Sequence, residues 1–385
     1  MSHNTSFVKH SPTSLLEKIA LHGFTQPSAI VAHARLARPL EPAHVRAALV
    51  SARLRWPRLA SRVHTRLGTP IAFVTAEDAI IPVHEHALLT AESLLTVPDL
   101  RREPPVCVHL AGAELVLHAH HAVLDGAGAL QLARHLAQPE PTLPAPTRAR
   151  RSRFEWPTSR RLPADAFGCD ARLDGAFVDL PIDSDSFVLP RGFSDYRQRA
   201  RAAGSTFSQW MTARLLEAFA RYGSARGEPA AARGVLLAAA RPSAPGRYAA
   251  TQIPIEASVD ELVDRGALHA SIARQLRRRH APSPLAMALF YLGRRVRPPQ
   301  RRGPFHARSV HFTYSDLSHW DLARVLLRDN ALLDLRVLVT PSHPEHAGLT
   351  VTRIGDALHL VLLATRGVVA LRSLREHLLT TLEER

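Results

Sequence analysis

Apolar and polar residues along the chain repeat with two different periods, one typical of strands and one typical of helices. Alternating or continuous apolar runs between turn residues predict strands at residues 29–36, 71–74, 80–83, 106–110, 114–120, 235–239, 252–257, 309–313, 349–354 and 357–364. Apolar residues spaced three and four apart predict helices at residues 42–56, 129–137 and 206–223, and a last helix that ends near residue 383. Because both halves contain strands and helices, we expect an α/β or α+β fold.

Local signals predict where two of these helices begin and end. Pro57 disfavours helical geometry in the residue before it, so the first helix should end at Trp56. Thr206 and Gln209 have the spacing of a capping box, which places the start of a second helix there. Gly223 is expected to end that helix.

A segment rich in proline and arginine separates the two halves. Residues 139–163 contain the prolines at 139, 141, 144, 146, 157 and 163. Proline at this density interrupts helices and strands, as in linkers between domains. We therefore predict two domains, residues 1–150 and residues 151–385.

The composition is that of an ordinary globular protein, with 46% hydrophobic and 22% charged residues. No apolar run reaches the roughly 18 residues of a membrane-spanning helix. Residues 1–14 do not show the pattern of a signal peptide. The sequence has two cysteines, Cys107 and Cys169, which suits a reducing compartment. We expect a cytoplasmic protein without a membrane span.

The net charge of +15 is the most unusual feature of the composition. All but two of the 49 basic residues are arginine, and they are dispersed along the chain. They form no basic stripe interleaved with aromatic residues, so we expect no nucleic-acid partner. A basic surface would still attract the phosphates of CoA or an acidic carrier protein.

Residues 120–126, His-His-Ala-Val-Leu-Asp-Gly, carry the most specific chemistry in the sequence. Alternation along the predicted strand 114–120 places His121 on the apolar face of that strand, where a histidine is out of pattern. An imidazole titrates near neutral pH and can take a proton from an attacking hydroxyl or amine. Asp125 follows four residues later, and Gly126 permits a close backbone approach.

Two other interpretations of these histidines stay open. A histidine at the end of a strand is more commonly structural than catalytic. The string formed by His118, His120, His121 and Asp125 also suggests a metal site. Because His118 and His120 point away from His121 on a regular strand, and no second ligand cluster is evident, we expect no metal.

The same segment resembles a known superfamily. It matches the full His-His-x-x-x-Asp-Gly signature of peptide-synthetase condensation domains, polyketide-associated acyltransferases, plant alcohol acyltransferases and chloramphenicol acetyltransferase-like folds. A Pro-Pro-Val sequence at residues 104–106 precedes the motif. Residues 55–59, Arg-Trp-Pro-Arg-Leu, resemble the Arg-His-Pro-x-Leu end of an early helix in that family. The likeness extends weakly from about residue 14 to the end of the chain.

The resemblance implies an architecture and a site. Two chloramphenicol-acetyltransferase-like subdomains would form a V shape with a tunnel between them. An acyl thioester donor and an acceptor would enter this tunnel from opposite faces and meet at His121. His120 and Gly126 would support the motif around that catalytic histidine.

The resemblance also implies partners for the motif in the second half. The aspartate of the family motif points away from the tunnel and pairs with an arginine, for which Arg241 is our candidate partner of Asp125. Ser315 and Asp316 are candidates for lining the tunnel. Their segment, residues 314–318, does not contain the Asp-Phe-Gly-Trp-Gly element, which argues against a plant-type alcohol acyltransferase.

We therefore predict direct acyl transfer from a CoA or carrier-protein thioester to a small-molecule alcohol or amine, in natural-product or lipid biosynthesis. The co-substrate would be acyl-CoA or a phosphopantetheinyl thioester, and no cofactor is expected to bind permanently. An acyl or peptidyl carrier protein is a potential partner. No Gly-x-Ser-x-Gly elbow is present, and Cys107 is interpreted as a small buried hydrophobe. The alternatives are a catalytically silent module that binds a carrier protein or partner enzyme, and an epimerisation or cyclisation at the same histidine.

Overall fold

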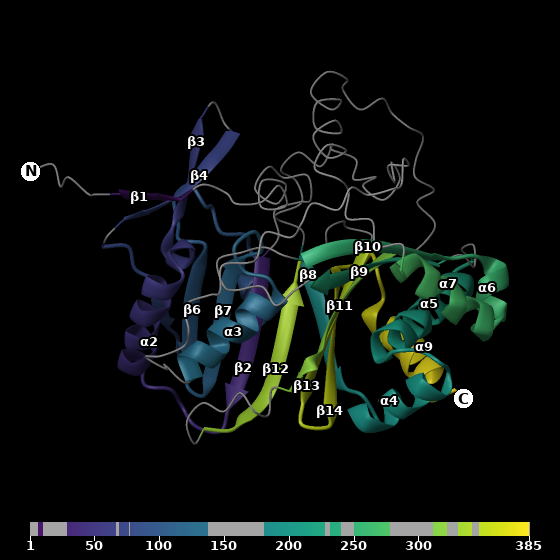
Figure 1. Ribbon diagram of the computed structural model, residues 1–385. Helices are drawn as coiled ribbons and strands as arrows, with labels where there is room; N and C mark the ends of the chain where they lie inside the picture. The colour runs from purple at the N-terminus through teal and green to yellow at the C-terminus, as the bar shows by residue number, and fades with distance from the viewer. Residues whose placement is uncertain are drawn as a thin grey trace, which may run out of the picture.

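The computed structural model describes residues 7–10, 29–66, 69–76, 78–137, 181–227, 232–239, 250–277, 311–321, 330–340 and 346–384. The strands are β1 (Phe7–His10), β2 (Ala29–Leu36), β3 (Arg62–Arg66), β4 (Thr69–Ala76), β5 (Val83–Glu85), β6 (Val106–Ala111), β7 (Glu114–His120), β8 (Ile182–Val188), β9 (Ala232–Ala239), β10 (Ala250–Ala257), β11 (His311–Asp321), β12 (Leu332–Val339), β13 (His346–Ile354) and β14 (Ala357–Thr365). The helices are α2 (Pro42–Arg55), α3 (Gly126–Ala137), α4 (Phe193–Ala202), α5 (Phe207–Ala225), α6 (Val259–Val263), α7 (Arg265–Arg277) and α9 (Leu371–Glu383), with 3-10 turns η1 (Pro57–Ala60) and η2 (Ala91–Leu94). These elements confirm the predicted mixed α/β class (Figure 1).

The amino-terminal half is built on a five-stranded sheet in the order β12-β2-β7-β6-β5. β2 lies between β7 and β12 and is antiparallel to both. Helices α2 and α3 cover one face, and their apolar side chains form one buried core with those of β2, β6 and β7. The small sheet β1-β4-β3 projects from this half (Figure 1).

The carboxy-terminal half is built on a six-stranded sheet in the order β10-β9-β11-β13-β14-β8. Helices α4, α5, α7 and α9 pack their apolar side chains against one face of it. Phe219 of α5 stacks on Phe312 of β11 with ring centroids 4.6 Å apart. A Cβ at Gly234 of β9 would lie 2.3 Å from the Phe312 ring, so this close packing requires glycine.

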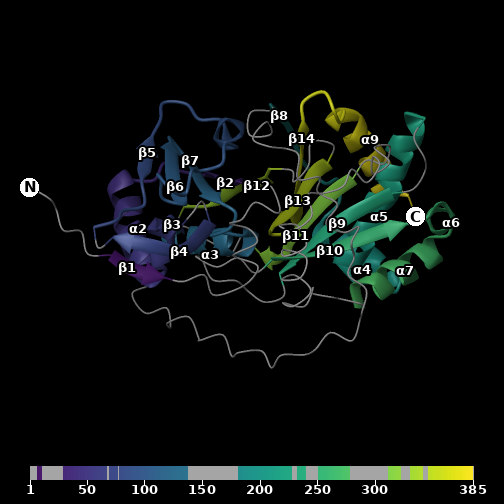
Figure 2. The ribbon, with the colours of Figure 1, turned by 90° about the horizontal axis from the view of Figure 1, so that it is seen from above.

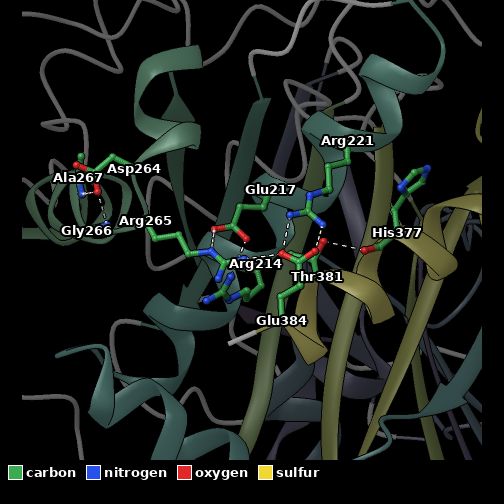
Figure 3. A network of polar contacts seen from close by, with 10 residues as sticks. All are labelled: Arg214, Glu217, Arg221, Asp264, Arg265, Gly266, Ala267, His377, Thr381 and Glu384. Carbon is green, nitrogen blue, oxygen red and sulfur yellow. Dashed lines mark hydrogen bonds and ion pairs between the residues drawn. The ribbon is translucent and has the colours of Figure 1, made fainter.

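A network of charged residues joins α5, α7 and the end of α9 (Figure 3). Arg214 and Glu217 of α5 form an ion pair with 2.7 Å between Nη1 and Oε2, and both side chains are 5% exposed. Glu384 accepts hydrogen bonds from Arg221 and Arg265, each at 2.5 Å. Arg265 also lies 3.5 Å from Glu217 and so connects the two pairs. The network ties together the helices that cover the carboxy-terminal sheet.

A strand from the second half of the sequence completes the sheet of the first half. β12 pairs antiparallel with β2 at the sheet edge. Between the two large sheets lies a separate buried cluster, in which Val31, Val116 and Leu338 of the first sheet meet Val361 and Leu363 of β14. The two halves of the sequence are therefore joined by backbone pairing within one sheet, and the two sheets share an apolar contact and lie side by side in Figures 1 and 2.

Most predicted elements occur where the sequence placed them. The helix at residues 42–56 is α2, and the strands at residues 106–110 and 114–120 are β6 and β7. Thr206 and Gln209 form both hydrogen bonds of the predicted capping box at the start of α5. That helix does not end at Gly223 but runs to Ala225, because the glycine that takes the left-handed conformation after the Arg226 cap is Gly227, with φ +74°.

Other predictions were incomplete or are outside the described residues. β11 extends to residue 321, well past the predicted end at residue 313. The sequence patterns did not identify β1, β3, β8, β12, α4, α6 or α7. The strand predicted at residues 80–83 is displaced, because the structure places β5 at Val83–Glu85. The proline-rich segment 139–163 lies outside the described residues, so the division near residue 150 stays a prediction, as do the V shape and the tunnel. In the described part of the chain, no helix has the length and apolar character to cross a bilayer.

Candidate active site

The motif occupies the turn between β7 and α3. β7 ends at His120, and the next residues form a turn closed by a 3.0 Å hydrogen bond from the Val123 N–H to the His120 carbonyl. The Ala122 N–H donates to Nδ1 of the His120 ring at 3.1 Å. Val123 and Leu124 are fully buried in the amino-terminal core. The local sequence thus anchors the turn through one histidine and two apolar side chains.

His120 supports this turn as a neutral side chain. Its Nδ1 accepts a hydrogen bond, so the ring carries its proton on Nε2. Burial, with a smaller contribution from His121, lowers the pKa of His120 to about 4. An uncharged ring at neutral pH suits a role in holding the backbone of the motif.

His121 lies in the turn itself, so its direction is set by the turn and not by strand alternation. Its side chain is buried, with 7% exposure. Burial lowers the pKa of His121, and the nearby negative charge of Asp125 opposes that shift. The imidazole is therefore neutral at neutral pH and able to accept a proton.

Asp125 forms the amino-terminal cap of α3. Its Oδ1 accepts a 2.8 Å hydrogen bond from the Gly128 N–H, and its own carbonyl accepts from the Ala129 N–H at 2.8 Å. The side chain is 3% exposed. Capping satisfies a backbone donor that the first helical turn leaves without an intrahelical partner. Asp125 thereby fixes α3 at the end of the turn that holds His121.

Gly126 brings α3 against the second half of the chain. A Cβ at this position would lie 3.1 Å from both δ-methyl groups of Leu317 on β11. Leu317 belongs to the amino-terminal core although β11 lies in the carboxy-terminal sheet. The His121 turn is thus placed next to a contact between the two halves, and α3 lies between them in Figure 2.

The two predicted tunnel residues differ in their surroundings. Asp316 accepts hydrogen bonds from the Ser208 hydroxyl of α5 and from the Ser318 N–H and hydroxyl, the last two at 3.0 and 2.6 Å. Ser315 is the next residue along β11 and, by strand alternation, shares a face with Leu317. Ser315 is the one of the two that lies on the face toward α3. The tunnel role of both stays a prediction.

Sequence reasoning missed several of these neighbours. Leu317 and Ser318 belong to the segment 314–318 that the family resemblance singled out, but they lie beyond the predicted end of their strand, and their contacts were not predicted. Ser208 was predicted only as part of a helix. The patterns gave no signal for their contacts, because these depend on how two distant elements pack. Arg241, the predicted partner of Asp125, lies outside the described residues.

No protein-family model and no curated protein sequence matches the chain. Solved structures do match it over nearly its whole length. Polyketide synthase associated protein 5 from Mycobacterium tuberculosis has a TM-score of 0.62 at 16% identity, covering 100% of both chains. The condensation domain of the Monacolin K polyketide synthase MokA has a TM-score of 0.63 at 12% identity, covering 98% of this chain and 96% of that one.

The structure of an acetyltransferase is similar to this chain to the same degree. TRI3 trichothecene 15-O-acetyltransferase from Fusarium sporotrichioides has a TM-score of 0.60 at 13% identity, covering 99% of this chain and 96% of that one. At such low identity these likenesses establish the fold alone. The chain has the fold of condensation domains and CoA-dependent acyltransferase-like proteins.

Proposed function

We propose that the protein is an acyltransferase in which His121 acts as the general base. The observation that carries this proposal is the buried, neutral imidazole of His121 in a turn fixed by the Asp125 cap. The fold supports it, because it is shared with an acetyltransferase and with condensation domains. A positioned neutral imidazole is the side chain most often used for proton removal at neutral pH.

In the proposed reaction, an acceptor hydroxyl or amine attacks the carbonyl carbon of an acyl thioester. His121 takes the proton of the attacking group as the new C–O or C–N bond forms. The tetrahedral intermediate then collapses, the C–S bond breaks, and the proton passes from the imidazolium to the departing thiolate. Holding both substrates together can lower the barrier by roughly 7–11 kcal/mol, and general-base assistance adds about 10²–10⁴-fold in rate.

We propose CoA or a phosphopantetheinyl carrier protein as the holder of the acyl donor. Two of the structural neighbours are a polyketide-synthase-associated protein and a condensation domain, and a third is an acetyltransferase. The net charge of +15 would attract the phosphates of CoA or an acidic carrier protein at long range. The acceptor is a small alcohol or amine.

A thiol-release assay tests the proposal. The purified full-length protein is mixed with a panel of acyl-CoAs or acyl carrier proteins, and with pooled alcohol or amine acceptors. We expect thiol release that requires an acceptor, and a loss of about 10²–10⁴-fold in turnover in His121→Ala. His33→Ala is the matched control, because His33 lies on the neighbouring strand β2 and outside the motif.

The outcomes separate the hypotheses. Wild-type turnover in a folded His121→Ala variant would overturn the base assignment. No acceptor-dependent release from any donor, together with carrier-protein binding that His121→Ala leaves unchanged, would favour the catalytically silent module. Far-UV circular dichroism of each variant verifies that the fold is retained.

A further inference from the structure

A second group of histidines lies on the five-stranded sheet, together with Cys107. The register of the strands brings these side chains together. Cys107 of β6 lies directly across from His118 of β7, and His109 of β6 lies across from His84 of β5. Cys107 and His109 are two residues apart and so share a face of the sheet. The sequence does not show this grouping, because its members come from three strands.

Three donor atoms of this group converge. Cys107 Sγ lies 3.2 Å from Nε2 of His109 and 3.4 Å from Nδ1 of His118. All three atoms lie within 4.8 Å of one another. A tetrahedral zinc site with bond lengths of about 2.3 Å to sulfur and 2.0–2.1 Å to nitrogen requires a sulfur–nitrogen separation of about 3.5 Å. The two sulfur–nitrogen distances therefore already approach those of a metal site.

The second ring nitrogen of each of the two histidines has a polar partner that fixes the orientation of the ring, as in known metal sites. The Nε2–H of His118 donates to the Thr96 carbonyl at 2.7 Å, which leaves its Nδ1 as a lone pair directed at Cys107. The other ring nitrogen of His109, Nδ1, lies 2.9 Å from Nε2 of His86. Ligating histidines generally use their second nitrogen in this way, toward a carbonyl or another polar group.

Without a metal, the ring of His109 is neutral and Cys107 carries its proton. Burial, with contributions from the neighbouring histidines, lowers the pKa of His109 to about 4, so its ring is neutral at neutral pH. Burial and the charge of Glu103 raise the pKa of Cys107 to about 12, so the metal-free side chain is a thiol. In that state, a chain of hydrogen bonds can run from His86 through His109, Cys107 and His118. Binding of a cation would release the thiol proton to solvent. The proton of His109 would move from Nε2 to Nδ1 and be donated to Nε2 of His86, whose own proton would then lie on its Nδ1.

We propose that Cys107, His109 and His118 form a binding site for Zn²⁺ or a similar thiophilic divalent cation. One thiolate and two imidazoles are the donor set that zinc prefers, and three protein ligands leave a fourth position for water. The exposed side chains of His84 and His86 border the group and provide an approach from solvent.

The site is distinct from the one built around His121. His118 lies on the face of β7 opposite Leu117, which packs in the core beneath α2 and α3. A bound cation would link β6 to β7, and through Thr96 to the segment before β6. It would thus stabilise the strand that leads into the motif, without a part in acyl transfer. This inference does not rest on the proposed function, and it revises our expectation that the chain carries no metal site.

Cobalt and zinc titrations of the full-length protein test the inference. Protein stripped with a chelator is titrated with Co²⁺, which absorbs through a thiolate-to-metal charge-transfer band and through visible bands characteristic of tetrahedral sites. We expect one equivalent to bind and to be displaced by Zn²⁺. Cys107→Ser should lose the charge-transfer band and bind at least about 100-fold more weakly. His86→Ala removes an outer contact and should weaken binding by about 10–100-fold.

Cys169→Ser is the matched control, since Cys169 is the other cysteine of the sequence. It should keep the band and the affinity of the wild type. As a second readout, Zn²⁺ should raise the melting temperature of the wild type and of Cys169→Ser, but not that of Cys107→Ser. A wild-type protein without the charge-transfer band or stoichiometric zinc would overturn the proposal. So would binding that survives in Cys107→Ser and disappears in Cys169→Ser.

Discussion

The cap that Asp125 provides to α3 predicts how two substitutions at this position differ. Its buried Oδ1 accepts a hydrogen bond from the Gly128 N–H at 2.8 Å. Asparagine keeps an oxygen at this place and equals aspartate as a helix cap, whereas alanine removes the acceptor. An N-cap contributes about 0.5–2 kcal/mol, and a buried donor left unsatisfied costs about 1–3 kcal/mol. We expect Asp125→Ala to lower the free energy of unfolding by about 1–3 kcal/mol, and Asp125→Asn by less than about 1 kcal/mol.

An ion pair at Asp125 would change the relative cost of the two substitutions. If an ion pair with Arg241 held Asp125 in place, both substitutions would break it from one side, at a cost of about 3–5 kcal/mol. Urea unfolding at pH 7, followed by circular dichroism, measures both variants. The capping argument is refuted if asparagine costs as much as alanine. A double-mutant cycle with Arg241→Gln then shows whether that arginine carries the difference, because only a paired residue gives a coupling energy.

Three further expectations concern stability. Folding lowers the pKa of His120 from an ordinary value of 6.5 to about 4. The contribution of this shift to the free energy of unfolding, about 3 kcal/mol, is complete above pH 6.5 and is lost as the pH falls toward 4. His120→Asn, which keeps an acceptor for the Ala122 N–H, should flatten that part of the stability–pH curve. Gly126→Val should destabilise by about 1–3 kcal/mol through overpacking on Leu317, and Leu317→Ala should partly restore the double variant in urea unfolding. Glu217→Gln should cost about 3–5 kcal/mol, because it leaves Arg214 buried without its ion pair.

Each of these expectations has a control or a contrary outcome. Glu376→Gln removes one side of an exposed ion pair with Arg372, whose side chains are 67% and 94% exposed, and should change stability by less than about 1 kcal/mol. Equal costs for Glu217→Gln and Glu376→Gln would contradict the role of burial. An unchanged pH dependence in His120→Asn would show that other groups account for acid sensitivity. Strictly additive effects at Gly126 and Leu317 would show that the two side chains do not compete for space.

Sequence patterns predicted best what depends on neighbouring residues. The capping box of Thr206 and Gln209 and the hairpin of β6 and β7 are local, so composition and spacing were sufficient. The alternation along β7 was also predicted correctly, since Leu117 packs in the core beneath α2 and α3 while Val116 packs on the opposite face. The motif at residues 120–126 led to a fold that the solved structures confirm.

The rest depended on pairing between distant segments. β8 reads as a polar run, Ile-Asp-Ser-Asp-Ser-Phe-Val, because its side chains are mostly half-buried at the edge of the sheet. The turn that orients His121 ends the alternation one residue early, which periodicity alone does not reveal. Cys107 was interpreted as a small buried hydrophobe, yet it lies between two histidines because β6 and β7 set it opposite His118. A cross-strand register of this kind follows from packing and not from spacing in sequence.

The place of β12 in the amino-terminal sheet has a consequence for how the protein is made. The Ala29 N–H of β2 donates to the hydroxyl of Thr340, a residue 311 positions later in the chain. At synthesis rates of about 5–20 residues per second, the free edge of β2 waits roughly 15–60 s on the ribosome for the strand that closes it. Ile30 and Val31 lie on that edge, and an unpaired apolar strand is a template for pairing with other chains. Lower growth temperatures, and chaperones that shield nascent strands, should therefore raise the yield of folded protein. The gain should be larger than for a protein whose sheets are formed by strands close together in sequence.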